Sequence, residues 1–428
     1  MKVLVLGAAV SGKAAAALAR RLGHDVTVYD ESPEQVAGID ADRVATGEWD
    51  DGLLEGVEVV VTSPGIPEGA APIRAVIESG TPLWSEMEFA ARHLDIPYGA
   101  VTATNGKTTV TQAAAQMLAV SGMHAVAAGN IGTALSDVVG SDAEVAVVEA
   151  SSFQLRFIDE FRPDGAVLLN IAPDHLDWHA TFEGYVAAKR RIAENQAAVD
   201  LLVYDADDPG ASAAVEGLRP RLVPVSGGRL PVGGAGPQGD DLVVIDERFP
   251  LPDGGPVHVV DMAAAAVLAR HLGATREGIE RVLEVFTPAR HRRTLVGTWD
   301  GVAWVNDSKA TNPHAAVAAA SAYPSVVLIA GGRNKGLDLS PLGAVPSVKA
   351  VIAIGEAADE LAGSVAAGKF HRAPSLAAAI ALADHLARAG DTVLLAPACA
   401  SFDMFSSYGE RGDAFTRLVT TRKEGSRG

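Results

Sequence analysis

The residues best suited to chemistry form the segment Thr104-Asn-Gly-Lys-Thr-Thr109. It follows a short apolar run, Tyr98–Val101, and precedes an alanine-rich segment with helical spacing, Val110–Val120. A strand, a tight loop and Gly-Lys-Thr at a helix start are typical of a phosphate-binding loop, because backbone N–H groups and the positive end of the helix dipole then face the phosphates.

Two side chains of this loop have predicted roles. The Lys107 ammonium would reach the terminal phosphates, and the Thr108 hydroxyl would ligate magnesium. The usual pattern has a glycine five positions before Gly106, where this chain has Val101. The alternative interpretation is therefore an ordinary turn before a helix.

Four further polar clusters follow predicted strands or a domain boundary. They are Glu149–Gln154, Asn170–His179, Pro288–Arg293 and Asn306–Asn312. Open α/β sheets bind ligands at the carboxyl ends of their strands, and a carboxylate beside a phosphate loop can hold magnesium directly or through water. Each cluster alone could be a solvated loop or a helix cap, but the four together favour a functional site.

Three α/β regions must position these residues. Residues 1–95 alternate strands and helices, which predicts a doubly wound parallel sheet of the Rossmann type. Its first turn has Ala9 where a dinucleotide fingerprint requires a second glycine, so a nicotinamide cofactor is disfavoured. The predicted strands are Val3–Leu6, Asp25–Tyr29 and Val57–Thr62, with a helix over Lys13–Arg21.

Residues 96–288 form the predicted central ATP-binding domain with a mainly parallel sheet. Residues 219–256 are rich in Gly and Pro, which indicates hairpins or a flap. The predicted strands are His124–Ala127, Val145–Val148, Ala166–Asn170, Leu201–Tyr204 and Leu242–Ile245, and the helices are Met262–His271 and Arg276–Val285.

Residues 289–428 alternate again, which predicts a second open Rossmann-like sheet. Its predicted strands are Val302–Asn306, Val326–Ala330, Ala350–Ile354 and Thr392–Ala396, with helices over His314–Ala322 and Ser375–Ala389.

Composition narrows the function classes. The 428 residues are 48% hydrophobic and 21% charged, which is typical of a soluble globular protein. The net charge, 35 − 53 = −18, argues against a nucleic-acid-binding surface. A single cysteine, Cys399, excludes an intrachain disulfide, and no apolar run approaches the ~18 residues of a membrane span. We expect a cytoplasmic monomer without nucleic-acid or membrane partners.

The clusters together resemble the Mur ligase family, the ATP-dependent amide ligases of peptidoglycan precursor synthesis. The resemblance covers essentially the whole chain. The phosphate loop, Gly129–Gly132 and Asp174–Asp177 match the family. Asn306–Asn312, Pro397–Ser401 and Glu410–Gly412 match its D-glutamate-adding members.

The resemblance implies a two-step reaction in peptidoglycan synthesis. The carboxylate of UDP-N-acetylmuramoyl-L-alanine attacks the γ-phosphate of ATP and gives an acyl phosphate, and the amine of D-glutamate then displaces phosphate. Because two anions must meet, cations have to neutralise them. ATP and two magnesium ions are the implied cofactors.

The resemblance also assigns residues to the nucleotide and the metals. Lys107, His175 and Lys189 would be catalytic. One magnesium would be bound by Thr108 and Glu149, and a second by His175 and Lys189, with Lys189 carbamylated because an ammonium has no lone pair for a metal. For Lys189 the alternative is a lysine on a helix surface. The implied ATP-binding residues are Asn105, Gly106, Lys107, Thr108, Thr109, Arg292 and Asp307.

The implied substrate residues form three groups. Those at the UDP group are Val10, Ser11, Asp30, Glu31, Ser63 and Gly65. Those facing the muramoyl-alanine part are Asn130, Ser151 and Gln154. Those around D-glutamate are Lys309, Thr311, Lys335, Ser401, Phe402 and Tyr408.

The sequence departs from the family pattern in places. Asp261 occupies a position where the family often has asparagine near the adenine, and Ala103 replaces a glycine of the phosphate loop. Three alternatives stay open: a ligase of the same family that adds another amino acid, a kinase or switch that forms no amide, and a nucleotide-binding protein without catalysis.

Overall fold

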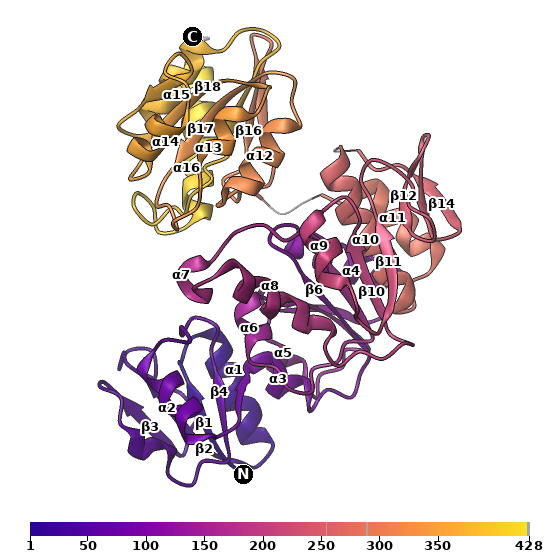
Figure 1. The fold of residues 1–428 in the computed structure, drawn as a ribbon, viewed down its shortest axis with the longest axis vertical. Helices are drawn as coiled ribbons and strands as arrows, with labels where there is room; N and C mark the ends of the chain where they lie inside the picture. The colour runs from indigo at the N-terminus through magenta and orange to yellow at the C-terminus, as the bar shows by residue number, and fades with distance from the viewer. Residues whose placement is uncertain (254, 288–289, 426–428) are drawn as a thin grey trace. The chain divides into compact units, whose positions relative to one another are not determined.

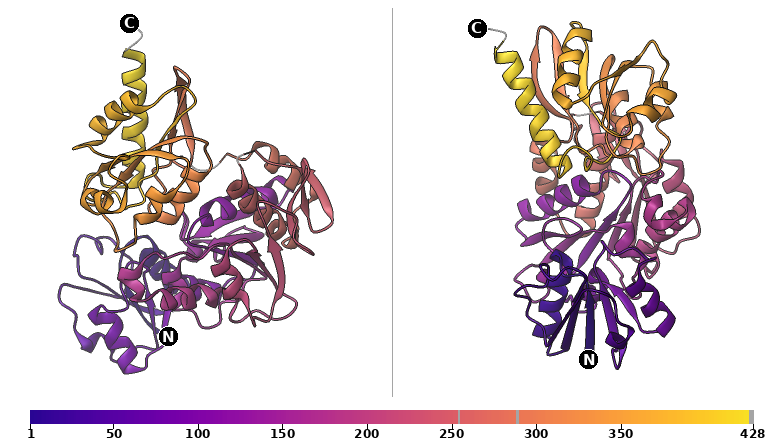
Figure 2. Two further views of the ribbon diagram at one scale, coloured as in Figure 1. Left: turned by 45° about the horizontal axis from the view of Figure 1, so that its top comes forward. Right: turned by 90° about the vertical axis from the view of Figure 1, so that its left-hand side faces the viewer.

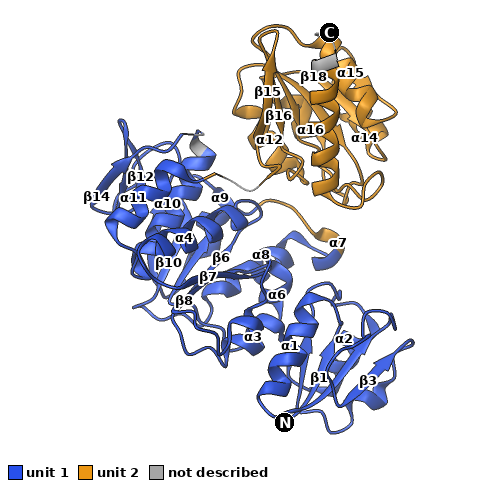
Figure 3. Cartoon of the chain, turned by 180° about the vertical axis from the view of Figure 1, so that it is seen from behind, with its two compact units in different colours: residues 1–171, 178–286 blue, residues 172–177, 287–428 orange. Residues whose placement is uncertain are grey.

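The computed structural model describes residues 1–253, 255–287 and 290–425 (Figure 1). They divide into two compact units, residues 1–171 with 178–286 and residues 172–177 with 287–428 (Figure 3). Among the described residues, no helix combines the length and the apolar character needed to cross a bilayer.

The first sheet is parallel throughout and has the order β3-β2-β1-β4-β5. Its strands are indigo in the right-hand view of Figure 2. The strands are β1 (Lys2–Leu6), β2 (Asp25–Asp30), β3 (Arg43–Thr46), β4 (Val59–Thr62) and β5 (Leu83–Ser85). The helices are α1 (Val10–Arg21), η1 (Asp51–Leu54), α2 (Ala71–Ser79) and α3 (Glu86–Ala91).

Close packing at the first turn explains why α1 starts three residues before the predicted Lys13. A Cβ on Gly12 would lie 1.7 Å from the Gly7 carbonyl oxygen, so only glycine allows the helix to begin this close to the end of β1. The strand order reverses between β1 and β4, which is where doubly wound sheets bind ligands.

The second sheet has nine strands in the order β14-β13-β12-β11-β10-β9-β6-β8-β7. The pairs from β11 to β7 are parallel, whereas β12, β13 and β14 pair antiparallel and confirm the predicted hairpins. The strands are β6 (Tyr98–Thr102), β7 (Ala125–Gly129), β8 (Val145–Glu149), β9 (Gly165–Leu168), β10 (Leu201–Asp205), β11 (Arg221–Val225), β12 (Ala235–Gln238), β13 (Asp241–Val244) and β14 (Glu247–Pro250).

Alanine-rich helices cover this sheet closely. Half of the core side chains of α4 and α10 are alanine, so the two helices pack closely on each other and on the apolar strands. The helices are α4 (Lys107–Val120), α5 (Leu135–Val138), α6 (Ser152–Arg156), α7 (Leu176–His179), α8 (Phe182–Arg190), η2 (Arg191–Ala193), α9 (Pro209–Val215), α10 (Pro256–His271) and α11 (Arg276–Val285).

The third sheet belongs to the second unit and has the order β15-β16-β20-β17-β18-β19. The edge strand β15 pairs antiparallel, and the other described pairs are parallel. The strands are β15 (Thr294–Trp299), β16 (Val302–Asn306), β17 (Val326–Gly331), β18 (Val348–Ile354), β19 (Phe370–Arg372) and β20 (Thr392–Leu395). The helices are α12 (Pro313–Ser321), α13 (Ser340–Ala344), α14 (Ala358–Ser364), α15 (Leu376–Leu386) and α16 (Tyr408–Gly425).

The predicted class, α/β with three mainly parallel sheets, is confirmed. Each predicted strand has a counterpart whose ends differ by no more than two residues. The predicted domain ranges 1–95, 96–288 and 289–428 remain predictions, and residues 288 and 289 at the second boundary lie outside the described residues.

Candidate active site

The phosphate loop lies in the middle of the second sheet. Strand β6 pairs with both β8 and β9, and residues 103–106 connect it to α4. Gly106 has a φ of 97°, and a Cβ there would lie 2.6 Å from an Asp261 carboxylate oxygen. The predicted turn therefore requires glycine at this position, both for the backbone conformation and for the close approach of α10.

Asn170, just after β9, holds the loop through both its backbone and its side chain. Its carbonyl accepts the Thr104 N–H at 2.8 Å, and its side-chain oxygen accepts the Asn105 N–H at 2.8 Å. Its Nδ2 donates to the Asn105 carbonyl at 2.9 Å. The sequence predicted Asn170 only as the first residue of the polar cluster Asn170–His179 and assigned it no contact with the phosphate loop.

Lys107, the first residue of α4, is folded back over the loop. Its ammonium donates to the carbonyl oxygens of Ala103 at 2.7 Å and Thr104 at 3.1 Å. Thr108 follows in the first helical turn and is half-buried, whereas Thr109 is buried. The ammonium of Lys107 thus lies at the loop, as its predicted phosphate-binding role requires.

Glu149 ends β8 directly beside the loop. Its register partner is Val101 of β6, and the residue is 4% exposed. One carboxylate oxygen accepts from Asn130 Nδ2 at 3.2 Å, while the other, Oε2, is buried and has no hydrogen-bond partner among the described residues. A buried carboxylate oxygen without a donor is costly, and a bound cation would satisfy it.

The donor set suits magnesium better than a metal that needs a cage of protein side chains. The part of the chain that the structure describes contains no cluster of three or more His, Cys, Asp or Glu side chains able to hold a metal. Magnesium is commonly held by one or two protein oxygens together with substrate phosphates and water. Glu149, together with the predicted Thr108 hydroxyl, would fit that pattern.

Lys189 is not a surface lysine. It is 1% exposed, and its ammonium donates to the Ala103 carbonyl at 2.7 Å and to Thr102 Oγ1 at 3.4 Å. The same ammonium lies 4.7 Å from the centre of the Tyr185 ring, and the Tyr185 hydroxyl bonds Thr104 Oγ1 at 2.9 Å. Lys189 and Lys107 therefore share one loop carbonyl, although they are far apart in the sequence.

The first turn of α6 carries two predicted substrate residues. Ser151 and Gln154 form a capping box, in which the Gln154 side-chain oxygen accepts from both the backbone N–H and the hydroxyl of Ser151. Gln154 Nε2 is buried and has no partner in the described part of the chain, so it can donate to a ligand. Asn130, the third residue of this group, is exposed.

The predicted UDP residues lie at the carboxyl ends of the first sheet's strands. Both oxygens of Asp30 are used by the protein, because they accept the backbone N–H groups of Ala8 at 2.7 Å and Ser32 at 2.9 Å. The Ser63 hydroxyl donates to the Gly7 carbonyl at 3.2 Å. Of the remaining four, Val10, Glu31 and Gly65 are exposed and Ser11 is half-buried.

A carboxyl group with an unusual proton affinity lies at the end of β10. The pKa of the Asp205 carboxyl is raised to about 7, mainly by burial and in addition by the nearby carboxylates of Asp207, Asp208 and Asp261. A hydrogen bond from the Asp207 N–H, at 2.9 Å, opposes the shift. Sequence patterns did not point to this carboxyl group.

In the second unit, Asp174 is the centre of a polar cluster. Its carboxylate accepts from Lys335 Nζ at 3.0 Å and from Asn312 Nδ2 at 2.9 Å. Burial raises the pKa of Asp174, but the Lys335 ammonium, His175 and the two hydrogen bonds outweigh burial, so the pKa lies below its ordinary value. His175 is half-buried and has a φ of 54°.

Asp307 follows β16 and is 5% exposed. Burial raises its pKa, and the positive charges of Arg293 and Arg292 only partly offset this effect. One carboxylate oxygen accepts the Arg293 backbone N–H at 3.3 Å. Arg292 and Asp307, both predicted to bind ATP, therefore lie within electrostatic range of each other.

A buried arginine organises the predicted D-glutamate loops. Arg411, at 1% exposure, donates to the hydroxyl and carbonyl of Ser308, each at 3.0 Å, and to the Cys399 carbonyl at 3.2 Å. Burial lowers its pKa to about 10. The Lys309 ammonium lies 5.9 Å from the centre of the Tyr408 ring. Sequence reasoning used Arg411 only for family resemblance.

The other predicted D-glutamate residues differ in exposure. Ser401 is buried, Thr311 is half-buried and Phe402 is 65% exposed.

Each unit thus brings together part of the predicted site. The first unit places Lys107, Glu149 and Lys189 around one loop. The second unit holds Arg292 and Asp307, predicted to bind ATP, together with His175, predicted to bind a metal, and the predicted D-glutamate residues. The assembly of all of these residues into one site stays a prediction.

Three family profiles match the chain. The profile described as "Mur ligase middle domain" matches residues 101–226, and "Mur ligase, glutamate ligase domain" matches residues 291–399. The profile "Alanine dehydrogenase/PNT, C-terminal domain" matches residues 1–79.

Full-length relatives give a sharper comparison. A protein of Shouchella clausii named UDP-N-acetylmuramoylalanine–D-glutamate ligase is 40% identical over 439 residues, covering 98% of this chain and 97% of that protein. The protein of the same name from Myxococcus xanthus is 39% identical over 444 residues, covering 98% of each.

Solved structures share the fold. A pseudomurein peptide ligase type C from Methanothermus fervidus gives a TM-score of 0.62 at 17% identity, covering 99% of this chain and 100% of that chain. The MurF ligase of Thermotoga maritima in complex with ADP gives 0.58 at 17% identity, covering 87% and 91%. With two family profiles and near-complete alignment to these relatives, the chain belongs to the Mur ligase family, in the group whose curated members are named UDP-N-acetylmuramoylalanine–D-glutamate ligase.

Proposed function

We propose that the protein is an ATP-dependent, ADP-forming ligase that joins D-glutamate to UDP-N-acetylmuramoyl-L-alanine in peptidoglycan precursor synthesis. Relatives of that name align with 97% and 98% of their own length, so the proposal concerns the whole chain. The reaction takes place in the cytoplasm, where ATP and the nucleotide-linked substrate are available.

The observation that carries the proposal is the arrangement around the phosphate loop. Two ammonium groups, of Lys107 and Lys189, and the unsatisfied oxygen of Glu149 lie at one loop between β6 and α4. The Lys107 ammonium attracts anions and the Glu149 carboxylate oxygen attracts a cation, while the buried Lys189 amine is the group that a carbamate would convert into a further cation ligand. A site that must hold a polyphosphate, a metal ion and a substrate carboxylate together needs both kinds of group.

The chemistry explains why so many charges are required. A carboxylate resists attack by an amine, because its negative charge repels nucleophiles and oxide is a poor leaving group. Its oxygen therefore attacks the γ-phosphorus, the bond to ADP breaks, and an acyl phosphate forms. The amine nitrogen of D-glutamate then attacks the carbonyl carbon, loses a proton, and inorganic phosphate leaves.

Magnesium would be held by Glu149 and Thr108, and it would neutralise the charge of the ATP phosphates. Lys107 would bind the terminal phosphates through its ammonium, which has to leave the carbonyls of Ala103 and Thr104 to do so. Asn170 keeps the loop backbone in place during that exchange.

A carbamate on Lys189 would turn the buried ammonium into an oxygen ligand for a second magnesium, shared with His175. The burial of Lys189 beside the loop supports this role, since a surface lysine would have no reason to lie there.

Side-chain groups that can donate hydrogen bonds to a ligand indicate where the substrates would bind. Gln154 Nε2 would donate to the muramoyl-alanine part, with Ser151 and Asn130 nearby, and the UDP group would occupy the carboxyl end of the first sheet. The two carboxylates of D-glutamate would be met by cations and hydroxyl groups of the second unit. Those residues are Lys309, Thr311, Lys335, Ser401 and Tyr408, with Phe402 beside them.

A phosphate-release assay tests the proposal. The protein with ATP, magnesium and UDP-N-acetylmuramoyl-L-alanine should release phosphate when D-glutamate is added. L-glutamate, L-alanine or meso-diaminopimelate should give no more than background. Release with another amino acid would assign a different ligase, and phosphate transfer without amide formation would indicate a kinase.

A further inference from the structure

Residues 155–161 form the end of α6 and the loop that follows it. Their backbone is held by side chains that come just after α8, the helix that carries Lys189. Arg191, the first residue of η2, donates to the carbonyl oxygens of Leu155, Arg156 and Ile158. Asn195 donates from Nδ2 to the carbonyls of Asp159 at 2.7 Å and Phe161 at 3.2 Å. The carbonyls left over at the end of α6 are thus satisfied by residues that come shortly after Lys189 in the sequence.

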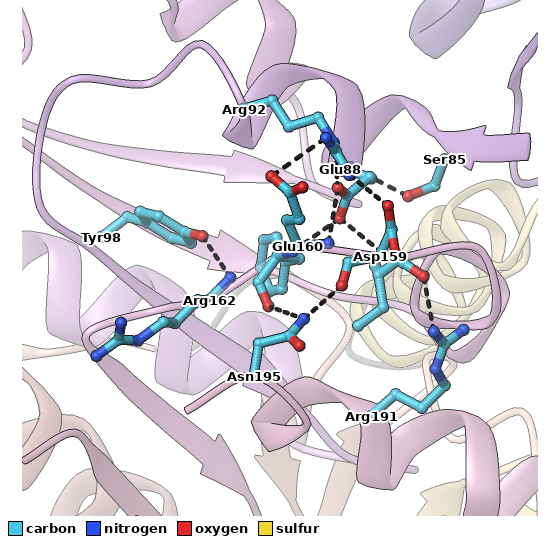
Figure 4. Close-up of polar contacts among 11 residues, drawn as sticks. Ser85, Glu88, Arg92, Tyr98, Asp159, Glu160, Arg162, Arg191 and Asn195 are labelled. Carbon is cyan, nitrogen blue, oxygen red and sulfur yellow. Dashed lines mark hydrogen bonds and ion pairs between the residues drawn. The ribbon is translucent and has the colours of Figure 1, made fainter. Parts of the chain in front are cut away.

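The N–H groups of the same segment are satisfied by the first sheet's helix α3. Glu88 is 0% exposed, and its carboxylate accepts the N–H groups of Asp159 at 3.0 Å, Glu160 at 3.0 Å and Phe161 at 2.8 Å. Figure 4 shows Glu88 and Arg92 on one side of Asp159 and Glu160, with Arg191 and Asn195 on the other. The segment is therefore fixed from both sides by charged or amide groups.

The start of α6 is tied to the same part of the chain. Ser152 Oγ and His179 Nε2 lie 2.9 Å apart, and the His179 ring packs edge-on against Tyr185 of α8 with ring centroids 5.4 Å apart. Helix α8 therefore has a link to α6 at each end, His179 before it and Arg191 after it.

We propose that Arg191 is a positioning residue for the ligase reaction: it sets the helix that carries Lys189 against the helix that carries Gln154. The Lys189 side chain extends from α8 to the phosphate loop. The Gln154 side chain, on α6, has an Nε2 group with no hydrogen-bond partner in the described part of the chain. These two groups serve the metal and the substrate carboxylate only if the two helices keep their relative position. The inference rests on the proposed function, which assigns those roles.

Arg190, the preceding residue, is a matched control. It also caps the end of a helix, because it donates to the carbonyls of Ala214 at 2.6 Å and Glu216 at 2.8 Å at the end of α9. Shortening Arg190 removes these two hydrogen bonds, whereas shortening Arg191 removes its bonds to three carbonyls and its ion pair with Glu194. The bonds of Arg191 to carbonyls hold α6 and those of Arg190 hold α9, so an activity loss in Arg191→Ala that exceeds what its thermal midpoint explains separates positioning from general stability.

The experiment compares Arg191→Ala with Arg190→Ala. Both variants should have a lower thermal midpoint than the parent protein, and Arg191→Ala should lose more because it removes more hydrogen bonds. With Arg191→Ala, kcat/KM for UDP-N-acetylmuramoyl-L-alanine should fall at least about tenfold below that of Arg190→Ala, a ratio equivalent to ~1.4 kcal/mol. The KM for D-glutamate should be unchanged, because the residues that would bind it belong to the second unit.

Two further measurements keep the test decisive. Arg191→Lys should recover part of the activity, and added guanidinium at low concentration should raise the rate of Arg191→Ala but not of Arg190→Ala. Equal kcat/KM for the two alanine variants, or a loss that tracks the thermal midpoint alone, would overturn the positioning role. D-glutamate-dependent phosphate release by the unmodified protein tests the proposed function separately.

Discussion

Replacement of Asp205 by asparagine should change how stability depends on pH. The folded pKa of this carboxyl, about 7, is raised from an ordinary value of 3.8. Between those values the folded protein binds a proton that the unfolded chain has released. The free energy of unfolding therefore falls as pH rises through that window. The whole destabilisation by the ionised Asp205 carboxylate is present above pH 7.

The size of this destabilisation follows from the pKa shift of Asp205. A difference of about three pKa units at ~1.4 kcal/mol per unit gives roughly 4 kcal/mol as an upper limit. Partial exposure and local relaxation reduce it to about 1–3 kcal/mol. The asparagine side chain would keep an oxygen to accept the Asp207 N–H and would place an amide donor among Asp207, Asp208 and Asp261. The Asp205→Asn variant should be more stable than the parent protein by this amount at about pH 8, and nearly equal to it at about pH 4.

Urea unfolding followed by circular dichroism, at half-unit steps from about pH 4 to about pH 8, measures the difference in midpoint. Asp240→Asn on the exposed turn between β12 and β13 is the control and should show no such trend. If the midpoint difference between Asp205→Asn and the parent protein is the same at every pH, the carboxyl titrates normally and the reasoning is wrong.

Four other predictions concern the site. Lys107→Ala should abolish phosphate release, and near-normal turnover would remove its phosphate role. Lys189→Ala should be inactive and regain part of its rate with added short carboxylates, whereas parent-like activity would end the carbamate proposal. Asn170→Ala, which loses two loop hydrogen bonds, should raise the KM for ATP by about tenfold, and an unchanged KM would show that the loop holds its shape without them. In a double-mutant cycle, Asp174→Asn and Lys335→Met should show a coupling of ~1–3 kcal/mol in urea unfolding, and additive effects would mean that the pair contributes little.

Local patterns were enough to predict most of the strands, because buried parallel strands appear as short apolar runs between turn residues. The elements that sequence reasoning missed lack that pattern. β3 (Arg43–Thr46) is a short edge strand whose residues are largely exposed. α1 begins earlier than predicted because its first turn depends on a close contact between Gly12 and Gly7, which propensity does not encode.

The missed site residues depend on pairing between distant segments. Asn170 holds the phosphate loop only because β9 lies beside β6. Arg411 is buried because loops of the third sheet converge on it, and Asp205 has a raised pKa because folding buries it and gathers other carboxylates around it. Motifs identified Lys107, Glu149 and Lys189 as candidates, but burial and partners could come only from the structure.

The assignment of residues 172–177 to the second unit affects how that unit could be isolated. Its sequence is discontinuous, since Asp174 comes from a segment far before Thr287 in the chain. A fragment that starts at residue 287 would keep Lys335 and Asn312 but lose the carboxylate that both of them contact. Such a fragment would carry a half-buried cation without its counter-charge, and supplying residues 172–177 as a fused peptide would be the way to restore it.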